Sequence, residues 1–342
     1  MEKWKVLFTA EADDAVLKKL DNHVQLEFAG WKTERTILSE EQLIAALKGK
    51  QVLATSYDKV TRKVIESCPQ LKLIVCGRAN PVNVDYVTAK EHGITVAFTP
   101  GRNSDVTAEF AVGMLLNIAR GISQSNRAIL DGLAITDDPP PAPKTDVTWG
   151  KVKDIHPYMM YKGPQIRNKN VGLVGFGSIG RRVGDIMSGF GANLLVYDPF
   201  VQPLDIVRPG VSVVDFETLL KEADFISCHM KITKETTGLF DYAAFQKMKP
   251  TAYFINNSRG SVVVEQDLVR ALRERIIAGA ALDVFEYEPL YKGHPFVTGE
   301  LDNVLVTPHI SGASDDAVTN GTVMLVDEIL RFISGRPGLN VM

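Results

Sequence analysis

The chain has 342 residues, of which 45% are hydrophobic, and its formal net charge is −3. This length favours two domains, and the apolar content is sufficient for globular cores. The weak net charge excludes the strongly basic surface typical of nucleic-acid-binding proteins, so no nucleic acid partner is expected.

The first hundred residues alternate short apolar segments with helix-like segments. The expected strands are Lys5–Thr9, Val52–Thr55, Leu73–Val75 and Thr95–Ala97. The expected helices between them include Glu40–Lys48, Arg62–Ser67 and Val84–His92. Strands separated by helices predict a small α/β domain with a parallel sheet covered on both faces. This part of the chain contains no phosphate-binding glycine fingerprint.

A long helix is predicted from Asn103 onward and would lead from one domain into the next. The apolar residues that recur there at helical spacing are Ala108, Ala111, Val112, Leu115, Leu116 and Ala119. The prolines within 137–143 then exclude regular structure, because proline lacks a backbone donor and fixes φ. Residues 132–165 are therefore expected to form a loop or arm, either a contact with a second subunit or a surface insertion.

A glycine fingerprint follows the predicted strand Val171–Val174. Its loop residues, all expected to contact a dinucleotide, are Gly175, Phe176, Gly177, Ser178, Ile179 and Gly180. A helix is expected over Arg181–Phe190 and a strand over Asn193–Tyr197, with Asp198 at its end. The first glycine makes a tight turn, the second lets a pyrophosphate approach the backbone, and the third lets the helix pack on the strand. The helix N-terminus offers free N–H groups to the phosphates.

The acid at the end of that second strand predicts which cofactor binds. Asp198 would accept hydrogen bonds from the ribose hydroxyls of NAD, and its charge would repel the 2′-phosphate of NADP. The next residues, Pro199 and Phe200, supply no arginine to accept that phosphate. The sequence therefore predicts NAD rather than NADP.

A second strand–helix series runs from Asn170 to about Ile310. The expected strands are Val171–Val174, Leu194–Tyr197, Phe225–Cys228, Ala252–Asn256, Ala280–Val284 and Val304–Val306. The last helix pattern, Ser314–Ser334, has no strand after it, so it most simply packs back on the first domain. We expect a substrate domain formed by residues 1–103 and 312–342, an NAD-binding domain formed by residues 104–311, and a ligand cleft between them.

Cysteine, histidine and apolar patterns exclude several other classes of protein. The three cysteines, Cys68, Cys76 and Cys228, are too few and too far apart for a disulfide framework or a zinc site. The six histidines are scattered, so no metal is expected. The N-terminus shows no signal peptide, and no segment approaches the roughly 18 apolar residues that span a membrane. A soluble, cytoplasmic protein without a membrane partner is expected.

Candidate catalytic groups follow predicted strands, where ligands of open α/β sheets bind. Arg259 follows one strand, and a guanidinium can hold a carboxylate with two hydrogen bonds. The segment Ala281–Pro289 contains three acids, and His309 lies within Thr307–Gly312. A histidine oriented by a carboxylate from a neighbouring strand end is a candidate general acid and base.

These motifs together resemble the D-isomer-specific 2-hydroxy acid dehydrogenases. The resemblance rests on Gly175–Gly180, Asn257–Gly260, Leu282–Pro289 and Thr307–Ile310, and it extends to Gly93–Gly101 and Val106–Glu109 in the first domain. It implies two Rossmann-like domains. One is an NAD-binding domain with a doubly wound parallel sheet, and the other is a smaller, discontinuous, flavodoxin-like substrate domain. It also implies NAD-linked interconversion of a D-2-hydroxy acid and its 2-keto acid, and a homodimer.

The resemblance assigns roles to single residues. Arg259 would hold the substrate carboxylate and polarise the keto oxygen, His309 would exchange the hydroxyl proton, and Glu288 would pair with His309. Asp283 would lie near the nicotinamide amide. The further residues expected to contact the cofactor are Thr107, His229 and Asn257, and those expected to contact the substrate are Arg78, Ala79 and Asn80.

The loop that holds the last three residues departs from the family pattern. Arg78 and Asn80 stand where the family usually has small glycines, so Arg78 either adds a positive charge to the cleft or points to solvent. Together with Arg102 and Lys231, Arg78 would favour a sugar-derived or phosphorylated acid. The basic pair that binds phosphate in phosphoglycerate dehydrogenases is absent around Thr55–Tyr57. Since the sequence ends at Met342, their regulatory domain is not expected, and both features weaken 3-phosphoglycerate as the substrate.

Two other functions are compatible with the same motifs. Some proteins of this fold act as NAD-sensing corepressors, and they can retain the catalytic residues, so a binding protein is the main alternative. A one-carbon or inorganic substrate such as formate or phosphite is a further alternative, but the polar loop around Arg78 argues mildly against it.

Overall fold

The computed structural model describes residues 3–133, 135, 156–202, 204, 206 and 209–342. The chain forms two compact units. Unit 1 contains Met1–Val106 and Ala313–Met342, and unit 2 contains Thr107–Gly312. The chain passes from one unit to the other within helix α6 (Ser104–Arg120).

Unit 1 has a five-stranded sheet in which every strand pair is parallel. Its strands, in chain order, are β1 (Trp4–Phe8), β2 (Val24–Phe28), β3 (Val52–Thr55), β4 (Leu73–Cys76) and β5 (Thr95–Phe98). They lie in the order β2-β1-β3-β4-β5, which is the flavodoxin-like order. The fold expected for the smaller domain is confirmed.

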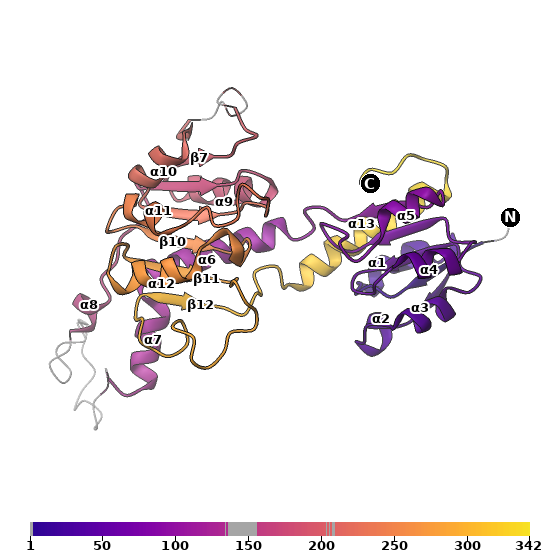
Figure 1. Cartoon of the computed structure of the whole chain (residues 1–342), viewed down its shortest axis with the longest axis horizontal. Coiled ribbons are helices and arrows are strands. Elements are labelled where there is room, and N and C mark those ends of the chain that lie inside the picture. Colours follow the sequence, from indigo (N-terminus) through magenta and orange to yellow (C-terminus); the bar gives the residue numbers. More distant parts are fainter. Residues whose placement is uncertain (1–2, 134, 136–155, 203, 205, 207–208) are drawn as a thin grey trace, which may run out of the picture. The chain divides into compact units, whose positions relative to one another are not determined.

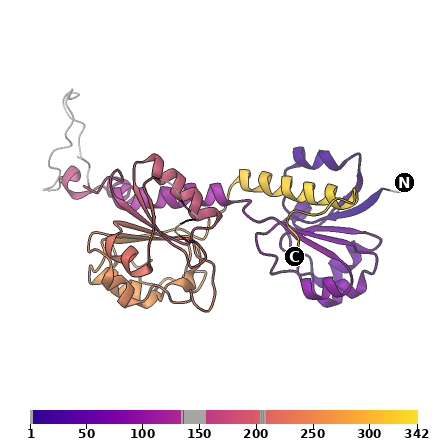
Figure 2. The ribbon, with the colours of Figure 1, turned by 90° about the horizontal axis from the view of Figure 1, so that it is seen from above.

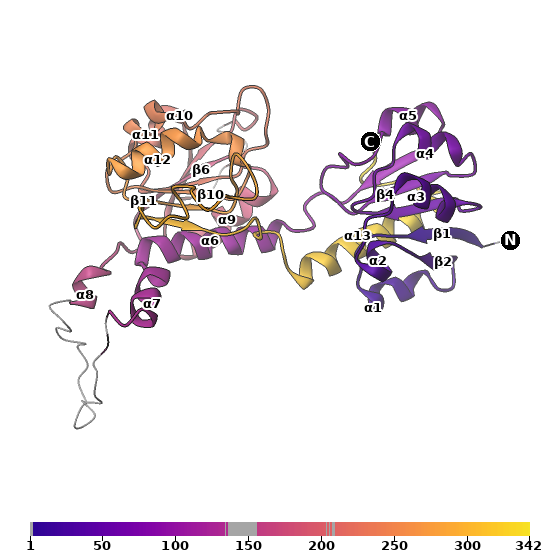
Figure 3. The ribbon, with the colours of Figure 1, turned by 60° about the horizontal axis from the view of Figure 1, so that its bottom comes forward.

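Helices cover both faces of this sheet (Figure 3). On one face lie α3 (Glu40–Leu47), α4 (Arg62–Ser67) and α5 (Tyr86–Glu91), and on the other lie α1 (Asp14–Leu17), η1 (Lys18–Leu20) and α13 (Asp315–Ile333). The short helix α2 (Trp31–Glu34) follows β2. Because α13 supplies Leu325, Val326 and Ile329 to the core of the second face, the C-terminal segment is an integral part of unit 1.

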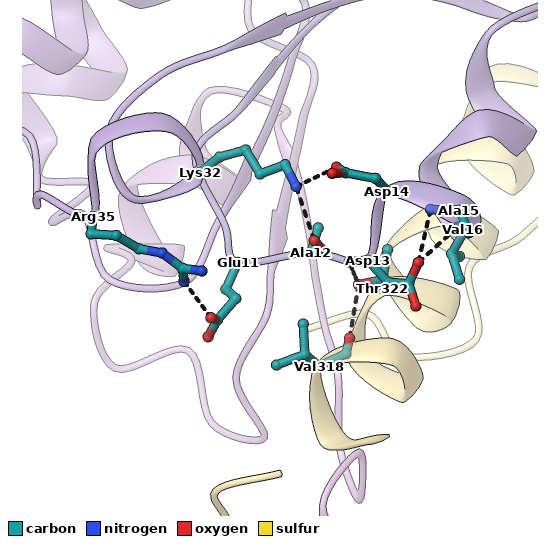
Figure 4. A network of polar contacts seen from close by, with 10 residues as sticks. All are labelled: Glu11, Ala12, Asp13, Asp14, Ala15, Val16, Lys32, Arg35, Val318 and Thr322. Atoms are coloured by element: carbon teal, nitrogen blue, oxygen red, sulfur yellow. Dashed lines mark hydrogen bonds and ion pairs between the residues drawn. The ribbon is translucent and has the colours of Figure 1, made fainter. Parts of the chain in front are cut away.

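Polar contacts join α13 to the loop after β1 (Figure 4). The backbone N–H of Asp13 donates to Thr322 Oγ1 at 3.0 Å, and Thr319 Oγ1 donates to the Asp13 carboxylate at 2.8 Å. Lys32 donates to the carbonyl of Ala12 at 2.9 Å, and Arg35 forms an ion pair with Glu11. These contacts fix the loop that leaves the carboxyl end of β1.

Unit 2 has a seven-stranded parallel sheet. Its strands are β6 (Asn170–Val174), β7 (Asn193–Tyr197), β8 (Val211–Val213), β9 (Phe225–Cys228), β10 (Tyr253–Asn256), β11 (Gly279–Leu282) and β12 (Val304–Val306). They lie in the order β12-β11-β10-β9-β6-β7-β8, and the stacking from β7 to β12 can be followed in Figure 1. Since the strand order reverses between β6 and β9, this is the doubly wound arrangement expected of a dinucleotide-binding sheet.

Two helical layers enclose this sheet (Figure 2). One layer contains α6 and α9 (Ser178–Gly189), and the other contains α10 (Phe216–Glu222), α11 (Tyr242–Lys247) and α12 (Glu265–Arg273). The 3₁₀ turn η3 (Gly260–Val262) precedes α12, and α7 (Ile122–Leu130) and α8 (Pro157–Met160) follow α6.

Three details differ from the sequence-based expectation. The strands β2 and β8 were not expected, and both are edge strands in their sheets. Helix α9 begins at Ser178, not at Arg181, so the glycine loop is shorter than expected. Within the segment expected to be a loop or arm, residues 134 and 136–155 lie outside the described residues, and Pro157–Met160 form a helix rather than a loop.

Among the described residues, no helix is long and apolar enough to cross a membrane, and no group of three or more potential ligands could hold a metal ion. The cysteines Cys68, Cys76 and Cys228 are buried and free.

Candidate active site

The glycine loop lies against the end of β9. Gly175 has a positive φ of 95°, and a Cβ there would lie 2.8 Å from the carbonyl carbon of His229. A Cβ on Gly180 would lie 2.1 Å from the carbonyl oxygen of Gly175. Around Gly177, in contrast, a Cβ would meet no atom within 4 Å. Gly175 and Gly180 are thus needed for packing, and Gly177 leaves open space where the pyrophosphate of a dinucleotide is expected.

Asp198 is bound to the glycine loop by its carboxylate. Oδ2 accepts the backbone N–H of Phe176 at 2.8 Å, and Oδ1 accepts that of Phe200 at 2.9 Å. The side chain is partly exposed at the end of β7, next to β6. The geometry therefore places a carboxylate beside the fingerprint loop, as recognition of a ribose requires.

Buried polar atoms without partners lie at the ends of strands near the point where the sheet order reverses. The Nδ1 atom of His229, after β9, and the Oδ1 atom of Asn257, after β10, are buried and accept or donate no hydrogen bond in the described structure. The hydroxyl of Thr107 is also buried without a hydrogen-bond partner in the described structure. Asn257 Nδ2 donates to the carbonyl of Thr107 at 3.1 Å. Since an unpaired buried polar group costs roughly 1–3 kcal/mol, these atoms fit contacts to a polar cofactor.

His229 is held in its neutral form. Burial lowers the pKa of its imidazole to about 3, so the ring carries no charge near neutral pH. Its Nε2 lies 2.9 Å from Ser227 Oγ, which leaves Nδ1 for another partner. A neutral ring beside the glycine loop neither attracts nor repels phosphates, so its contribution to binding a cofactor is that of a hydrogen-bonding group.

His309 and Glu288 form a close pair in unit 2. His309 Nδ1 lies 2.7 Å from Glu288 Oε2, and Glu288 Oε1 accepts the backbone N–H of Phe285 at 3.0 Å. Both side chains are partly exposed, 48% for His309 and 36% for Glu288, so solvent or a substrate can reach them. Because Nδ1 is bound to the carboxylate, the other ring nitrogen, Nε2, is the atom available for proton exchange.

The backbone of His309 is held in an unusual conformation by Asp283. His309 has a φ of 55°, in the left-handed region that residues other than glycine seldom adopt. The fully buried Asp283 accepts the N–H of Ile310 at 2.9 Å, the N–H of Ser311 at 2.8 Å and the hydroxyl of Thr307 at 2.6 Å. Asp283 therefore fixes the segment on both sides of His309, a role that the sequence pattern does not reveal.

Arg259 lies between β10 and η3 and is exposed. Its Nη1 donates to the carbonyl of Ser258 at 2.6 Å, and Asn256 Nδ2 donates to the carbonyl of Arg259 at 3.0 Å. A Cβ on the next residue, Gly260, would lie 1.9 Å from the carbonyl oxygen of Phe285. The arginine segment thus packs directly on the segment that leads to Glu288.

In unit 1, the loop with Arg78, Ala79 and Asn80 follows the carboxyl end of β4. Arg78 is half-buried, Ala79 and Asn80 are exposed, and the Arg78 guanidinium has no hydrogen-bond or ion-pair partner among the described residues. Burial raises the pKa of the neighbouring Cys76 thiol to about 11, and the positive charges of Arg78 and Arg102 act in the opposite direction. The thiol is therefore protonated and unreactive.

The other two cations of interest have different surroundings. Arg102 Nη1 donates to the carbonyl of Ala317 at 3.1 Å, and its side chain packs on Gly321, so part of its role is to anchor α13. It also lines a small hollow with Glu11, Ser56, Tyr57, Gly77, Val318, Gly321 and Leu325. Lys231 is exposed at the end of β9.

The buried carboxylate of Asp58 follows Ser56 and Tyr57, two of the residues that line this hollow. It accepts hydrogen bonds from Thr9 at 2.5 Å, from Thr55 at 2.8 Å and from the N–H of Leu38 at 2.9 Å. Asp58 thereby joins the ends of β1 and β3. It was not among the residues singled out by sequence, since a lone aspartate in a turn carries no distinctive signal.

Comparison with known proteins identifies the family that both units resemble. Residues 112–311 match the family described as D-isomer specific 2-hydroxyacid dehydrogenase, NAD binding domain. The glyoxylate reductase of Thermococcus litoralis is 34% identical over 333 residues, which cover 97% of this chain and 95% of that protein. The D-3-phosphoglycerate dehydrogenase of Archaeoglobus fulgidus is 33% identical over 309 residues, which cover 90% of this chain and 54% of that protein.

A solved structure shows the same likeness in three dimensions. The apo-structure of D-lactate dehydrogenase from Escherichia coli is similar with a TM-score of 0.75 and 26% identity, and the match covers 99% of each chain. The chain therefore belongs to the D-isomer specific 2-hydroxyacid dehydrogenase family, oxidoreductases that use NAD and act on the CH–OH group of their substrates.

Proposed function

We propose that this protein interconverts a D-2-hydroxy acid and its 2-keto acid, and that the acid carries a polar, sugar-derived or phosphorylated substituent. The reaction is supported chiefly by the 2.7 Å contact between His309 Nδ1 and Glu288 Oε2, which orients an accessible imidazole. The polar substituent is supported by Arg78, a half-buried cation without an ion-pair or hydrogen-bond partner for its guanidinium in the described part of the chain.

In this proposal His309 and Arg259 act on the acid itself. During keto acid reduction, His309 Nε2 donates a proton to the forming 2-hydroxyl oxygen, and during oxidation it accepts that proton. Glu288 stabilises the imidazolium and fixes the ring. Arg259 holds the substrate carboxylate with its planar guanidinium and polarises the keto oxygen. NADH, when bound, would supply the hydride for C2 of the keto acid.

In this proposal the cofactor would be held by residues from several strand ends of unit 2. The glycine loop with the start of α9 would bind the pyrophosphate, and Asp198 the ribose. Thr107, His229 and Asn257 would pair their free polar atoms with the remaining polar groups of NAD. A direct contact between Asp283 and the nicotinamide stays a prediction, because all the contacts of its carboxylate described above are to residues 307–311.

We expect wild-type protein to use NADH and to turn over NADPH poorly. The Asp198→Asn variant removes the charge that repels a 2′-phosphate, and its amide oxygen can still accept one of the two backbone N–H groups that Asp198 binds. Its preference for NADH should therefore fall about tenfold or more, since hydrogen bonds to charged groups are worth about 1.5–3 kcal/mol. Comparison of kcat/KM for the two cofactors checks this. Equal use of NADPH and NADH by the wild-type protein would show that Asp198 does not select the cofactor.

Replacement of Arg78 with alanine tests the substrate class. If its guanidinium binds an anionic or hydroxylated substituent, the Arg78→Ala variant should have a KM for the acid about tenfold higher. Arg62→Ala, which removes an exposed arginine of the same unit paired with Glu66 and Glu91, is the matched control and should leave KM unchanged. An unchanged KM in Arg78→Ala would show that Arg78 does not bind the substituent of the substrate.

The reaction itself is tested by NADH oxidation with a panel of 2-keto acids. The panel includes glyoxylate, hydroxypyruvate, pyruvate, branched keto acids, sugar keto acids and 3-phosphohydroxypyruvate. A strong rate with polar members and a weak rate with branched members is the expected result. No rate with any member, while NADH still binds, would instead favour an NAD-sensing binding protein.

We also propose a homodimer, supported by exposed apolar side chains on α7 and α8. The largest of these are Ile122, Ile129, Leu130, Tyr158, Met159 and Met160, with exposed fractions from 44% to 81%. Apolar surface of this kind is typical of an interface between copies. Sedimentation velocity over a concentration series should give the mass of two chains, and the mass of one chain would contradict it.

A further inference from the structure

The loop that carries Glu288 has few anchors of its own. Residues 286–289 are all exposed, between the buried Phe285 and the buried His294. The pair between Glu288 and His309 can keep its 2.7 Å separation only if the backbone of this loop is fixed. Contacts that fix this backbone from outside the loop therefore influence the position of the Glu288–His309 pair.

One carboxylate holds the loop at both ends. Glu265, the first residue of α12, accepts the backbone N–H of Glu286 with Oε2 at 3.1 Å. Its other oxygen, Oε1, lies 2.9 Å from Nε2 of His294. Both side chains are mostly buried, with exposed fractions of 13% for Glu265 and 9% for His294. A buried carboxylate with both oxygens engaged is a rigid support, because either contact would be costly to break.

His294 is fixed in one tautomer and one orientation. Its Nδ1 accepts the backbone N–H of Phe296 at 3.2 Å, so the proton resides on Nε2 and is donated to Glu265. The ring packs on Phe296, with centroids 4.9 Å apart, and on Tyr291, with centroids 5.4 Å apart. His294 therefore links the C-terminal end of the loop to the Glu265 carboxylate.

The same loop backbone also contacts the arginine segment. Gly260 approaches Phe285 and Glu286 so closely that a Cβ would lie 1.9 Å from the Phe285 carbonyl oxygen and 2.6 Å from the Glu286 nitrogen. The N–H of Glu286 that Glu265 binds is thus at the junction between the segment of Arg259 and the loop of Glu288. A shift at this junction would move both.

We propose that Glu265, oriented by His294, is a positioning residue that sets the geometry of the Glu288–His309 pair. The inference rests on the proposed function, since it assumes that this pair performs the proton exchange. Glu265 contacts neither substrate nor cofactor in this proposal. It acts through the backbone of residues 285–288.

The Glu265→Ala variant tests the proposal. Small displacements of catalytic groups can cost about 10² in rate, so kcat for keto acid reduction should fall roughly 10- to 100-fold. The Kd for NADH should stay within about twofold of wild type, because the residues proposed to bind NAD lie elsewhere. Asp267→Ala is the matched control. Asp267 lies in the same first turn of α12 and accepts the N–H of Tyr242 at 3.0 Å, so its loss should leave kcat unchanged.

Milder substitutions cover the case in which Glu265→Ala does not fold. Glu265→Gln can still accept the Glu286 N–H, but its amide opposes the Nε2 proton of His294, so a smaller loss of kcat is expected. His294→Gln retains a donor toward Glu265 and should preserve more activity than His294→Ala. If His294→Gln and His294→Ala have equal kcat values, the hydrogen bond to Glu265 has no part in catalysis and the proposal fails.

A double-mutant cycle with Glu288→Gln separates this inference from the proposed function. If Glu265 acts through Glu288, the double variant should have a kcat within about twofold of Glu288→Gln alone. If the losses of kcat in the two single variants multiply in the double variant, Glu265 acts independently of Glu288. That result would overturn the inference but leave the proposed function intact. A wild-type kcat for Glu288→Gln would overturn the proposed function itself.

Discussion

We expect the His309→Ala variant to lose about 10²–10⁴ in kcat while it binds NADH with an unchanged Kd. This range is typical for removal of a positioned acid or base, because the proton must then be exchanged with water. The side chain is half exposed and its ring contacts Glu288, so its loss leaves no large cavity. Steady-state rates on the preferred keto acid, together with a fluorescence titration with NADH, measure the two quantities separately.

The left-handed backbone of His309 calls for a second variant. Histidine already occupies this left-handed conformation at a φ of 55°, and asparagine adopts it more readily than alanine does. His309→Asn should therefore be as inactive as His309→Ala but more stable. His23→Ala, which removes an exposed histidine of unit 1, serves as the control and should keep full activity. Loss of NADH binding together with activity in both His309 variants would mean that His309 is structural.

The buried strands were predictable because their apolar residues fill two faces of a sheet. For the fully buried strands β3 and β9 the expected bounds agree with the structure. The edge strand β2 has the sequence Val-Gln-Leu-Glu-Phe, in which polar residues face solvent, and β8 has only three residues. Edge strands of this kind resemble loops in sequence, since a sheet neighbour on only one side demands fewer apolar side chains.

The parts of the site that follow from local chemistry were also predictable. The glycine fingerprint is read from sequence because its turn, the close packing of Gly180 on Gly175 and its helix start all occur within a few residues. The contacts of Asp283 with Ile310 and Ser311, and of Asp58 with Thr9, join segments far apart in the chain. Such contacts depend on which strands become neighbours, so they appear only in the folded structure.

We expect the Arg259→Gln variant to lose about 10²–10⁴ in kcat/KM for the keto acid. A guanidinium that grips a carboxylate makes two charge-assisted hydrogen bonds, each worth about 1.5–3 kcal/mol, and glutamine replaces neither the charge nor the fork. The side chain is exposed and bound only to the carbonyl of Ser258 in the described structure, so thermal stability should be unaffected. Steady-state kinetics and a thermal melt check both parts.

The Arg259→Lys variant shows whether charge or geometry matters. Lysine retains the positive charge but offers a single point donor, so kcat/KM should fall between wild type and Arg259→Gln. Arg273→Gln is the matched control, since Arg273 is an exposed arginine on α12 paired with Glu300, and it should behave as wild type. If Arg259→Lys has the same kcat/KM as the wild-type protein, only the positive charge of Arg259 contributes to substrate binding. If Arg259→Gln equals wild type, the substrate carboxylate is bound elsewhere, and Arg78 becomes the leading candidate, because its cation has no protein partner among the described residues.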